Sequence, residues 1–149
     1  MKKILLVIAI VFIAMQFYRP YENSNNVDNS KDFLIVEKAP KEIVEIFKTS
    51  CYDCHSNHTE YEWYDNIAPL SWYVDSNIKR AKFSLNFSEW GDFPSWRRLL
   101  FFQGAIPYDI DIKKMPPQNY LLMHSDAELS SDKKEQIARW ISNIDFTKE

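Results

Sequence analysis

The 149-residue sequence has only two glycines, Gly91 and Gly104. Because tight β-hairpins and phosphate-binding loops depend on glycine, this scarcity argues against a hairpin-rich fold and a Gly-rich nucleotide cradle. An excess of positive charge is also lacking, since 18 basic residues face 21 acidic ones and the net charge is −3. Without residues 1–19, which hold three of the basic residues, the balance is 15 against 21, or −6. An acidic protein is poorly suited to phosphate backbones, so we expect no nucleic-acid partner.

Cysteine and histidine are scarce as well, with two and three residues respectively. Hydrophobic residues, by contrast, make up 46% of the chain and aromatic residues 15%. This content is enough for a hydrophobic core and argues against wholesale disorder. The length suits one domain plus a short targeting segment.

The N-terminal residues have the pattern of an export signal. Lys2 and Lys3 precede an apolar run over residues 4–15, as in the charged and hydrophobic regions of signal sequences. The run is shorter than the roughly 20 residues of a full membrane span, although Phe17 and Tyr18 extend it with aromatics typical of a membrane interface. No A-x-A-like cleavage site follows, so we expect residues 1–19 to be an uncleaved signal-anchor rather than a removed signal peptide.

The rest of the chain divides into a tether and a folded domain. Residues 20–32 are polar and Asn-rich without periodicity, which predicts a tether. The domain is expected over residues 33–149, with four helices. The first follows Pro40 and ends near Ser50, and the second runs from about Pro69 to about Phe83.

The third helix is expected after an N-cap at Asp92, and the fourth after an N-cap at Ser130. Between them, residues 104–129 contain three prolines and are expected to be a long irregular stretch. The core-facing residues expected from the spacing are Ile43, Val44, Ile46 and Phe47, then Leu70, Tyr73, Val74 and Ile78, then Trp96, Leu99, Leu100 and Phe102, and finally Ile137, Trp140, Ile141 and Ile144. The fold class is therefore all-α.

One short motif carries chemistry. Cys51-Tyr-Asp-Cys54-His55 matches the C-x-x-C-H pattern of c-type haem attachment. In this pattern two thiols bond to the two vinyl groups of haem, and the adjacent histidine ligates the iron. Both cysteines of the chain are used, and attachment outside the cytoplasm agrees with the export signal. We therefore expect haem c, with its iron, as the cofactor.

Other uses of the two cysteines remain open. A redox disulfide between Cys51 and Cys54 normally follows a strand in a βαβ unit, and no strand is expected before Cys51. A zinc site would need His58 or His124 as further ligands, but the second close ligand pair of a structural zinc site is missing. An inert surface disulfide is a third alternative.

The sixth iron ligand is expected in the loop between the last two helices. Met115 lies 60 residues after His55 and is followed by Pro116 and Pro117, which stiffen the backbone around a weak thioether ligand. Met opposite His is common in electron carriers. His124 is the alternative sixth ligand, and in a protein with an open sixth site it would be a distal acid–base group. If it has neither function, we expect it to hydrogen-bond the backbone of the turn before the last helix.

Five segments resemble the bacterial small haem-binding domain family, which is related to cytochrome c. They are Cys51-Tyr-Asp-Cys-His-Ser-Asn57, Trp63-Tyr-Asp-Asn-Ile-Ala-Pro-Leu-Ser-Trp72, Asn86-Phe-Ser-Glu-Trp90, Met115-Pro-Pro-Gln-Asn-Tyr120 with His124, and Leu129-Ser130 up to Trp140. The resemblance covers about residues 40–141. It implies haem binding with Cys51 and Cys54 as attachment points and His55 as axial ligand. One departure is Ser125, where the family often has proline after the histidine.

Together these observations predict a small cytochrome c-like helical domain with a long irregular ligand loop, preceded by an N-terminal hydrophobic helix. We expect an electron carrier rather than a catalyst, on the periplasmic side and anchored in the inner membrane, with an unidentified redox partner protein. The alternatives are a haem enzyme or gas or redox sensor with an open sixth site, and a C-x-x-C redox or zinc module.

Overall fold

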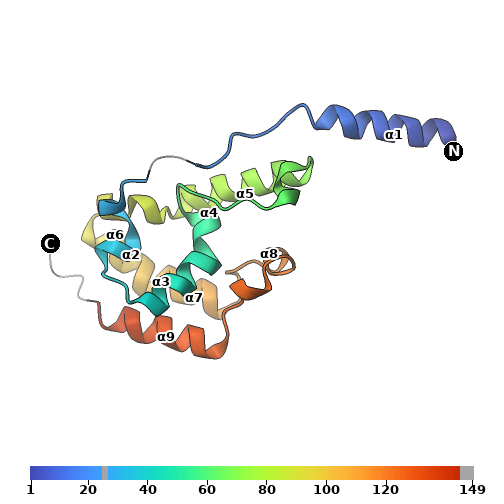
Figure 1. Ribbon diagram of the computed structural model, residues 1–149. Helices are drawn as coiled ribbons and strands as arrows, with labels where there is room; N and C mark the ends of the chain where they lie inside the picture. Colours follow the sequence, from blue (N-terminus) through green and yellow to red (C-terminus); the bar gives the residue numbers. More distant parts are fainter. Residues whose placement is uncertain (25–26, 145–149) are drawn as a thin grey trace.

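Figure 1 shows a computed structural model that describes residues 1–24 and 27–144 of the protein. The described chain is helical throughout, and its one β pairing is an isolated bridge between Ser24 and His58. The predicted all-α class is confirmed. The α-helices are α1 (Lys2–Met15), α2 (Phe33–Val36), α3 (Lys41–Phe47), α4 (Asp53–His55), α5 (Leu70–Ser84), α6 (Ser95–Leu100), α7 (Ile106–Asp111), α8 (Gln118–Leu121) and α9 (Ser131–Ser142).

Short 3-10 or π-helical turns join these helices. They are η1 (Asn29–Lys31), η2 (Lys48–Tyr52), η3 (Trp63–Asn66), η4 (Phe87–Asp92), η5 (Phe101–Ala105) and η6 (Ser125–Ala127). In Figure 1 the helices from α2 onward form one body, and α1 projects away from it.

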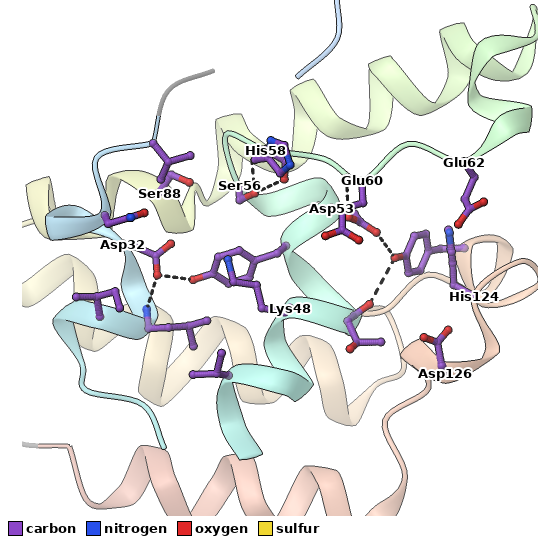
Figure 2. Close-up of a pocket in the computed structure, with 18 of the residues that line it drawn as sticks. Asp32, Lys48, Asp53, Ser56, His58, Glu60, Glu62, Ser88, His124 and Asp126 are labelled. Atoms are coloured by element: carbon purple, nitrogen blue, oxygen red, sulfur yellow. Dashed lines mark hydrogen bonds between the residues drawn. The ribbon is translucent and has the colours of Figure 1, made fainter. Parts of the chain in front are cut away.

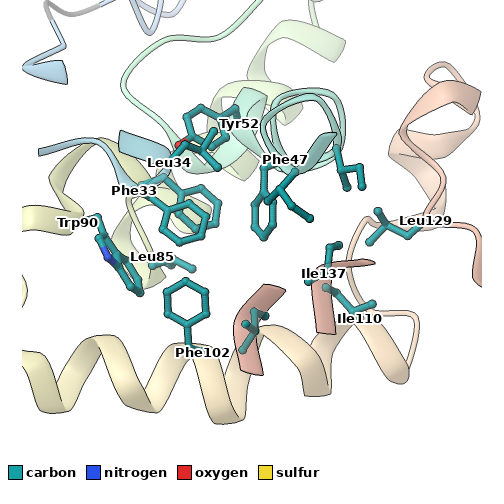
Figure 3. Close-up of a cluster of buried hydrophobic side chains, with 14 residues drawn as sticks. Phe33, Leu34, Phe47, Tyr52, Leu85, Trp90, Phe102, Ile110, Leu129 and Ile137 are labelled. Carbon is teal, nitrogen blue, oxygen red and sulfur yellow. The ribbon is translucent and has the colours of Figure 1, made fainter. Parts of the chain in front are cut away.

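The core is built around aromatic rings. Figure 3 shows Phe33 between helices that are far apart in the sequence. Its ring centroid lies 5.0 Å from that of Phe47, 4.8 Å from Phe87 and 5.1 Å from both Trp90 and Phe102. Such edge-to-face and stacked pairs add to the free energy gained by burying the rings. Phe33 thus joins α2, α3, η4 and η5 into one core.

The sequence predicted that the helix before the C-x-x-C-H motif ends near Ser50, and this prediction is wrong. α3 continues through the π-helical turn η2 directly into α4, so the chain stays helical as far as His55. The predicted end was based on Phe47, the last apolar residue at helical spacing in this segment. The helix is prolonged by the half-buried or buried side chains of the motif itself.

The stretch from residue 104 to residue 129 is not irregular. It holds α7, α8 and η6, together with the end of η5. Pro107 lies in the first turn of α7 and Pro117 is the N-cap of α8. Proline is tolerated at these positions because the first turn of a helix has no internal partner for its N–H groups. The prolines therefore begin short helices here instead of preventing them.

The fourth helix was predicted well. The side chain of Ser130 accepts a hydrogen bond from the backbone N–H of Lys133 at the start of α9, and Ile137 and Ile141 are buried. The second helix also lies where it was expected, but Leu70 and Tyr73 are about half exposed.

The third helix begins after Pro94, and its N-cap is Pro94 instead of the predicted Asp92, because Asp92 is the last residue of η4. The Asp92 carboxylate pairs with Lys31 at 2.9 Å. The predicted inward residues Trp96 and Leu100 are exposed, while Phe102 is fully buried.

Residues of the expected tether make specific contacts with the body. Asn23 is buried, and its side-chain amide donates hydrogen bonds to the carbonyl of Ser56 at 2.8 Å and to Thr59 Oγ1 at 2.9 Å. Its Oδ1 accepts a hydrogen bond from Lys82 at 2.6 Å. Asn23 therefore holds the segment against the end of the motif helix.

α1 is apolar on all sides, and none of its residues is buried. Within the described residues, the helices are all too short or too polar to cross a membrane.

Candidate functional site

The three motif residues lie on one side of the helical segment formed by α3, η2 and α4. Cys51, Cys54 and His55 are spaced three and four residues apart, which brings them to one face of a helix. All three are half-buried, and both thiols are free. The predicted group of two thiols and one imidazole is therefore assembled by local helical geometry.

The ring of His55 is oriented by a backbone group from another helix. Its Nδ1 lies 2.9 Å from the carbonyl oxygen of Leu85, the C-cap residue of α5. Because a carbonyl can only accept, Nδ1 is the donor and carries the proton. Nε2 is thereby left as the nitrogen with a lone pair for a metal.

The surroundings also keep this imidazole neutral. Burial lowers the pKa of His55, although hydrogen bonds to the backbone and the charge of Asp109 act in the opposite direction. A neutral imidazole is the form that ligates iron. The ring packs against Phe87, with the centroids 5.8 Å apart.

Both cysteines are held as neutral thiols. Burial, reinforced by Cys54, raises the pKa of Cys51 to about 12. Burial and the nearby carboxylates of Asp53 and Asp65 raise the pKa of Cys54 to about 11. Catalytic redox cysteines and zinc ligands act as thiolates. This site opposes thiolate formation in the absence of a metal, which disfavours the redox alternative.

The zinc alternative also lacks its further ligands. In the part of the chain that the structure describes, no three His, Cys, Asp or Glu side chains are grouped so that they could hold a metal ion. His58 is exposed and pairs through its backbone with Ser24, and His124 is engaged with Tyr64.

Met115 lies between α7 and α8, on a part of the chain that is close to the motif. Its backbone N–H donates to the carbonyl of Asp109 at 3.0 Å, and the Asp109 carboxylate is near enough to raise the pKa of His55. On the other side of Met115, the hydroxyl of Tyr120 donates a hydrogen bond to Asp53 Oδ2 within the motif at 2.7 Å. The structure therefore places this segment beside the motif, with the Met115 side chain half-buried.

His124 belongs to a cluster of polar aromatic residues. Its Nε2 lies 3.0 Å from the hydroxyl of Tyr64, and its ring lies 4.1 Å from the ring of Tyr120. Tyr120 in turn donates a hydrogen bond to Asp53 Oδ2 at 2.7 Å. The Nδ1 atom of His124 is buried and has no hydrogen-bond partner among the described residues.

A pocket on the opposite face of the motif helix was not predicted from the sequence. Figure 2 shows Lys48, Asp53 and Ser56 reaching it from this helix, with His124 and Asp126 on the far side. The pocket has a volume of about 630 Å³, and Cys51, Cys54, His55 and Met115 do not line it. Its polar residues come from segments without a common motif, so no sequence pattern marks it.

The comparisons with known proteins now give the class of the protein. The family model described as a haem-binding domain matches residues 10–143. No curated protein and no solved structure matches the chain.

The chain belongs to this haem-binding domain family, and the protein is an all-α haem-binding protein. The family match says nothing of how the haem is attached. The residues described above fit the cofactor, because a neutral imidazole with a fixed proton stands beside two thiols on one helix face.

Proposed function

We propose that the protein binds haem covalently as a c-type cytochrome and transfers single electrons. The observation that carries the proposal is the orientation of His55, whose Nδ1 is committed to the Leu85 carbonyl at 2.9 Å while its Nε2 remains for iron. This is the arrangement of a ligating histidine, in which a second bond fixes the tautomer and the ring.

Attachment uses the two thiols. Each S–H adds across one vinyl C=C bond of haem, so that sulfur bonds to one carbon and the proton ends on the other. No oxidant or reductant is needed. Because Cys51 and Cys54 are free thiols at neutral pH, they are in the state that this addition consumes.

In this proposal His55 and Met115 would hold the iron, and the haem would supply the one-electron chemistry when bound. The protein orients the imidazole, excludes water with the ring of Phe87 and presents Met115 from the segment between α7 and α8. A closed six-coordinate iron suits electron transfer more than catalysis.

We further propose that the chain is exported and that residues 1–19 hold it at the outer side of the inner membrane. Lys2 and Lys3 before an apolar helix with no buried residue support this placement. The redox partner is an unidentified protein of the same compartment.

The test is expression with a c-type maturation system, followed by a haem stain on a denaturing gel and mass spectrometry. We expect wild-type protein to keep its haem through denaturation and the Cys51→Ser/Cys54→Ser variant to lose it. Glu45→Ser, an exposed change on the same helix, is the control that keeps the stain. Mature wild-type protein without the added tetrapyrrole mass would contradict covalent attachment.

A second candidate is a haem sensor or enzyme with an open sixth position. It is favoured by one observation, the buried and unpartnered Nδ1 of His124, which would serve as a distal hydrogen-bonding or acid–base group. Rapid binding of carbon monoxide or cyanide to the protein as isolated supports this candidate, whereas a closed iron resists both.

A further inference from the structure

The domain exposes apolar side chains together at one end. Trp63, Leu70, Tyr73, Leu122 and Met123, here called the end face, come from η3, the start of α5 and the turn after α8. They are between 49% and 83% exposed. Isolated exposed apolar residues are ordinary, but a group of them marks a surface that contacts something apolar.

Hydrogen bonds between the three segments of the end face show that these segments lie side by side. Tyr64 of η3 is bonded to His124, next to Met123, with 3.0 Å between Oη and Nε2. Asn119 of α8 donates to the hydroxyl of Tyr73 in α5 at 2.5 Å. The residues of the end face therefore come from neighbouring segments at one end of the domain.

The end of α1 is fixed to the same end of the domain. Gln16 forms two hydrogen bonds with the backbone of Ala68, from Nε2 to O at 3.1 Å and from N to Oε1 at 3.0 Å. Trp72 Nε1 donates to the carbonyl of Tyr18 at 2.9 Å, and the two rings pack edge to face. These contacts hold α1 at the start of α5.

Figure 1 shows the consequence for the shape of the molecule. α1 leaves the domain at the end where α5 begins and where α8 lies, and it points away from the body. If α1 is inserted in a bilayer, the membrane surface meets the domain at this end.

We propose that the end face rests on the lipid bilayer, so that the haem domain sits end-on against the membrane instead of moving freely on a tether. The inference rests on the membrane anchoring proposed above. Tryptophan and tyrosine prefer the headgroup region of a bilayer, and leucine and methionine prefer its apolar side. The end face combines both kinds and lies at the end of the domain to which the C-terminal end of α1 is bonded.

The experiment places a single reactive thiol on the full-length holoprotein in phosphatidylcholine–phosphatidylglycerol nanodiscs that hold one copy each. Met123→Cys probes the end face. Phe83→Cys is the matched control, since Phe83 is 91% exposed but lies near the far end of the same helix, α5. The readout is the rate of modification by a water-soluble polyethylene glycol maleimide, followed as a gel shift.

We expect residue 123 to react about tenfold more slowly than residue 83, because burying one such side chain is worth about 1.4 kcal/mol and that free energy is a factor of ten. Adding Leu122→Glu should restore fast modification at residue 123. Equal, fast rates at both positions overturn the inference. Slow modification in crowded vesicles with fast modification in single-copy nanodiscs also overturns it, since the end face would then bind a second copy.

Two other results of the same experiment would disprove the proposed function without testing the end face. Protein that does not elute with the nanodiscs disproves the anchor. Modification of the parent protein, which has no added cysteine, shows that Cys51 or Cys54 is free and disproves the thioether bonds.

Discussion

At the scale of single residues, the site depends on which atoms of each side chain already have a hydrogen-bond partner. His55 has one nitrogen bonded to Leu85 and one left for a ligand, whereas His124 has its Nε2 bonded to Tyr64. The two histidines therefore differ in which ring nitrogen has a hydrogen-bond partner, and this difference comes from their contacts. The backbone N–H of Met115 is hydrogen-bonded to the carbonyl of Asp109, and its thioether is the group predicted to ligate iron.

Replacing Met115 with alanine tests the sixth ligand. We expect the absorption band assigned to methionine–iron ligation to disappear and the reduction potential to fall, because Met ligation raises the potential of haem iron. The measurements are the ferric absorption spectrum and a redox titration.

Met123→Ala is the matched control, since Met123 is exposed and should leave both properties unchanged. An unaltered spectrum in Met115→Ala, together with an altered one in His124→Ala, would transfer the ligand role to His124.

At the scale of elements, the motif helix is held from both ends. α3 packs on the last helix through Phe47 and Trp140, whose ring centroids are 5.9 Å apart. Beyond α4, Asn23 bonds to Ser56 and Thr59. The N-terminal segment thus contributes to the position of the cysteines, although it lies some 30 residues before them.

Asn23→Ala should lower the free energy of unfolding by about 2 kcal/mol, because it removes hydrogen bonds to the buried residues Ser56 and Thr59 and to the half-buried Lys82. Urea denaturation of the holoprotein measures the effect. The exposed Asn29, changed to alanine, is the control and should cost little. Equal free energies of unfolding for the two variants would mean that the hydrogen bonds of Asn23 do not stabilise the folded protein.

At the scale of the whole molecule, haem attachment changes how stability depends on pH. In protein made without haem, the pKa values of Cys51 and Cys54 lie above their ordinary value of 9.0, at about 12 and about 11. The folded state therefore keeps protons that the unfolded state releases above pH 9, so stability is full below pH 9 and is lost as the pH rises.

We expect apoprotein to lose stability between about pH 9 and about pH 11 more steeply than holoprotein, whose thioether sulfurs do not titrate. Urea denaturation across this range measures the difference. Tyr52 and Tyr120, whose pKa values are also raised, contribute in both forms and cancel in the comparison. The Cys51→Ser/Cys54→Ser apoprotein is the control and should show the shallower slope. Equal slopes for wild-type and variant apoprotein would disprove the thiol contribution.

The amino-acid sequence alone was enough for the local features. The C-x-x-C-H motif is contiguous, and the cap and apolar spacing of α9 lie within 15 residues, so both are readable without a fold. The all-α class follows from the same periodicity, and the family match confirms the haem-binding assignment. The roles of Met115 and His124 in iron ligation, the thioether bonds and the membrane anchor stay predictions.

Contacts between distant segments determined the features of the fold and site that the sequence did not predict. Leu70 was expected inside because of its spacing, but at the start of α5 it is about half exposed and belongs to the end face. Asp92 ends η4, which packs on η1, and its carboxylate pairs with Lys31, 61 residues away, while Pro94 is the N-cap of α6. The carbonyl that orients His55 comes from Leu85, and its position depends on where α5 ends. Contacts of this kind are set by how distant segments share one small core, and a one-dimensional pattern does not contain that information.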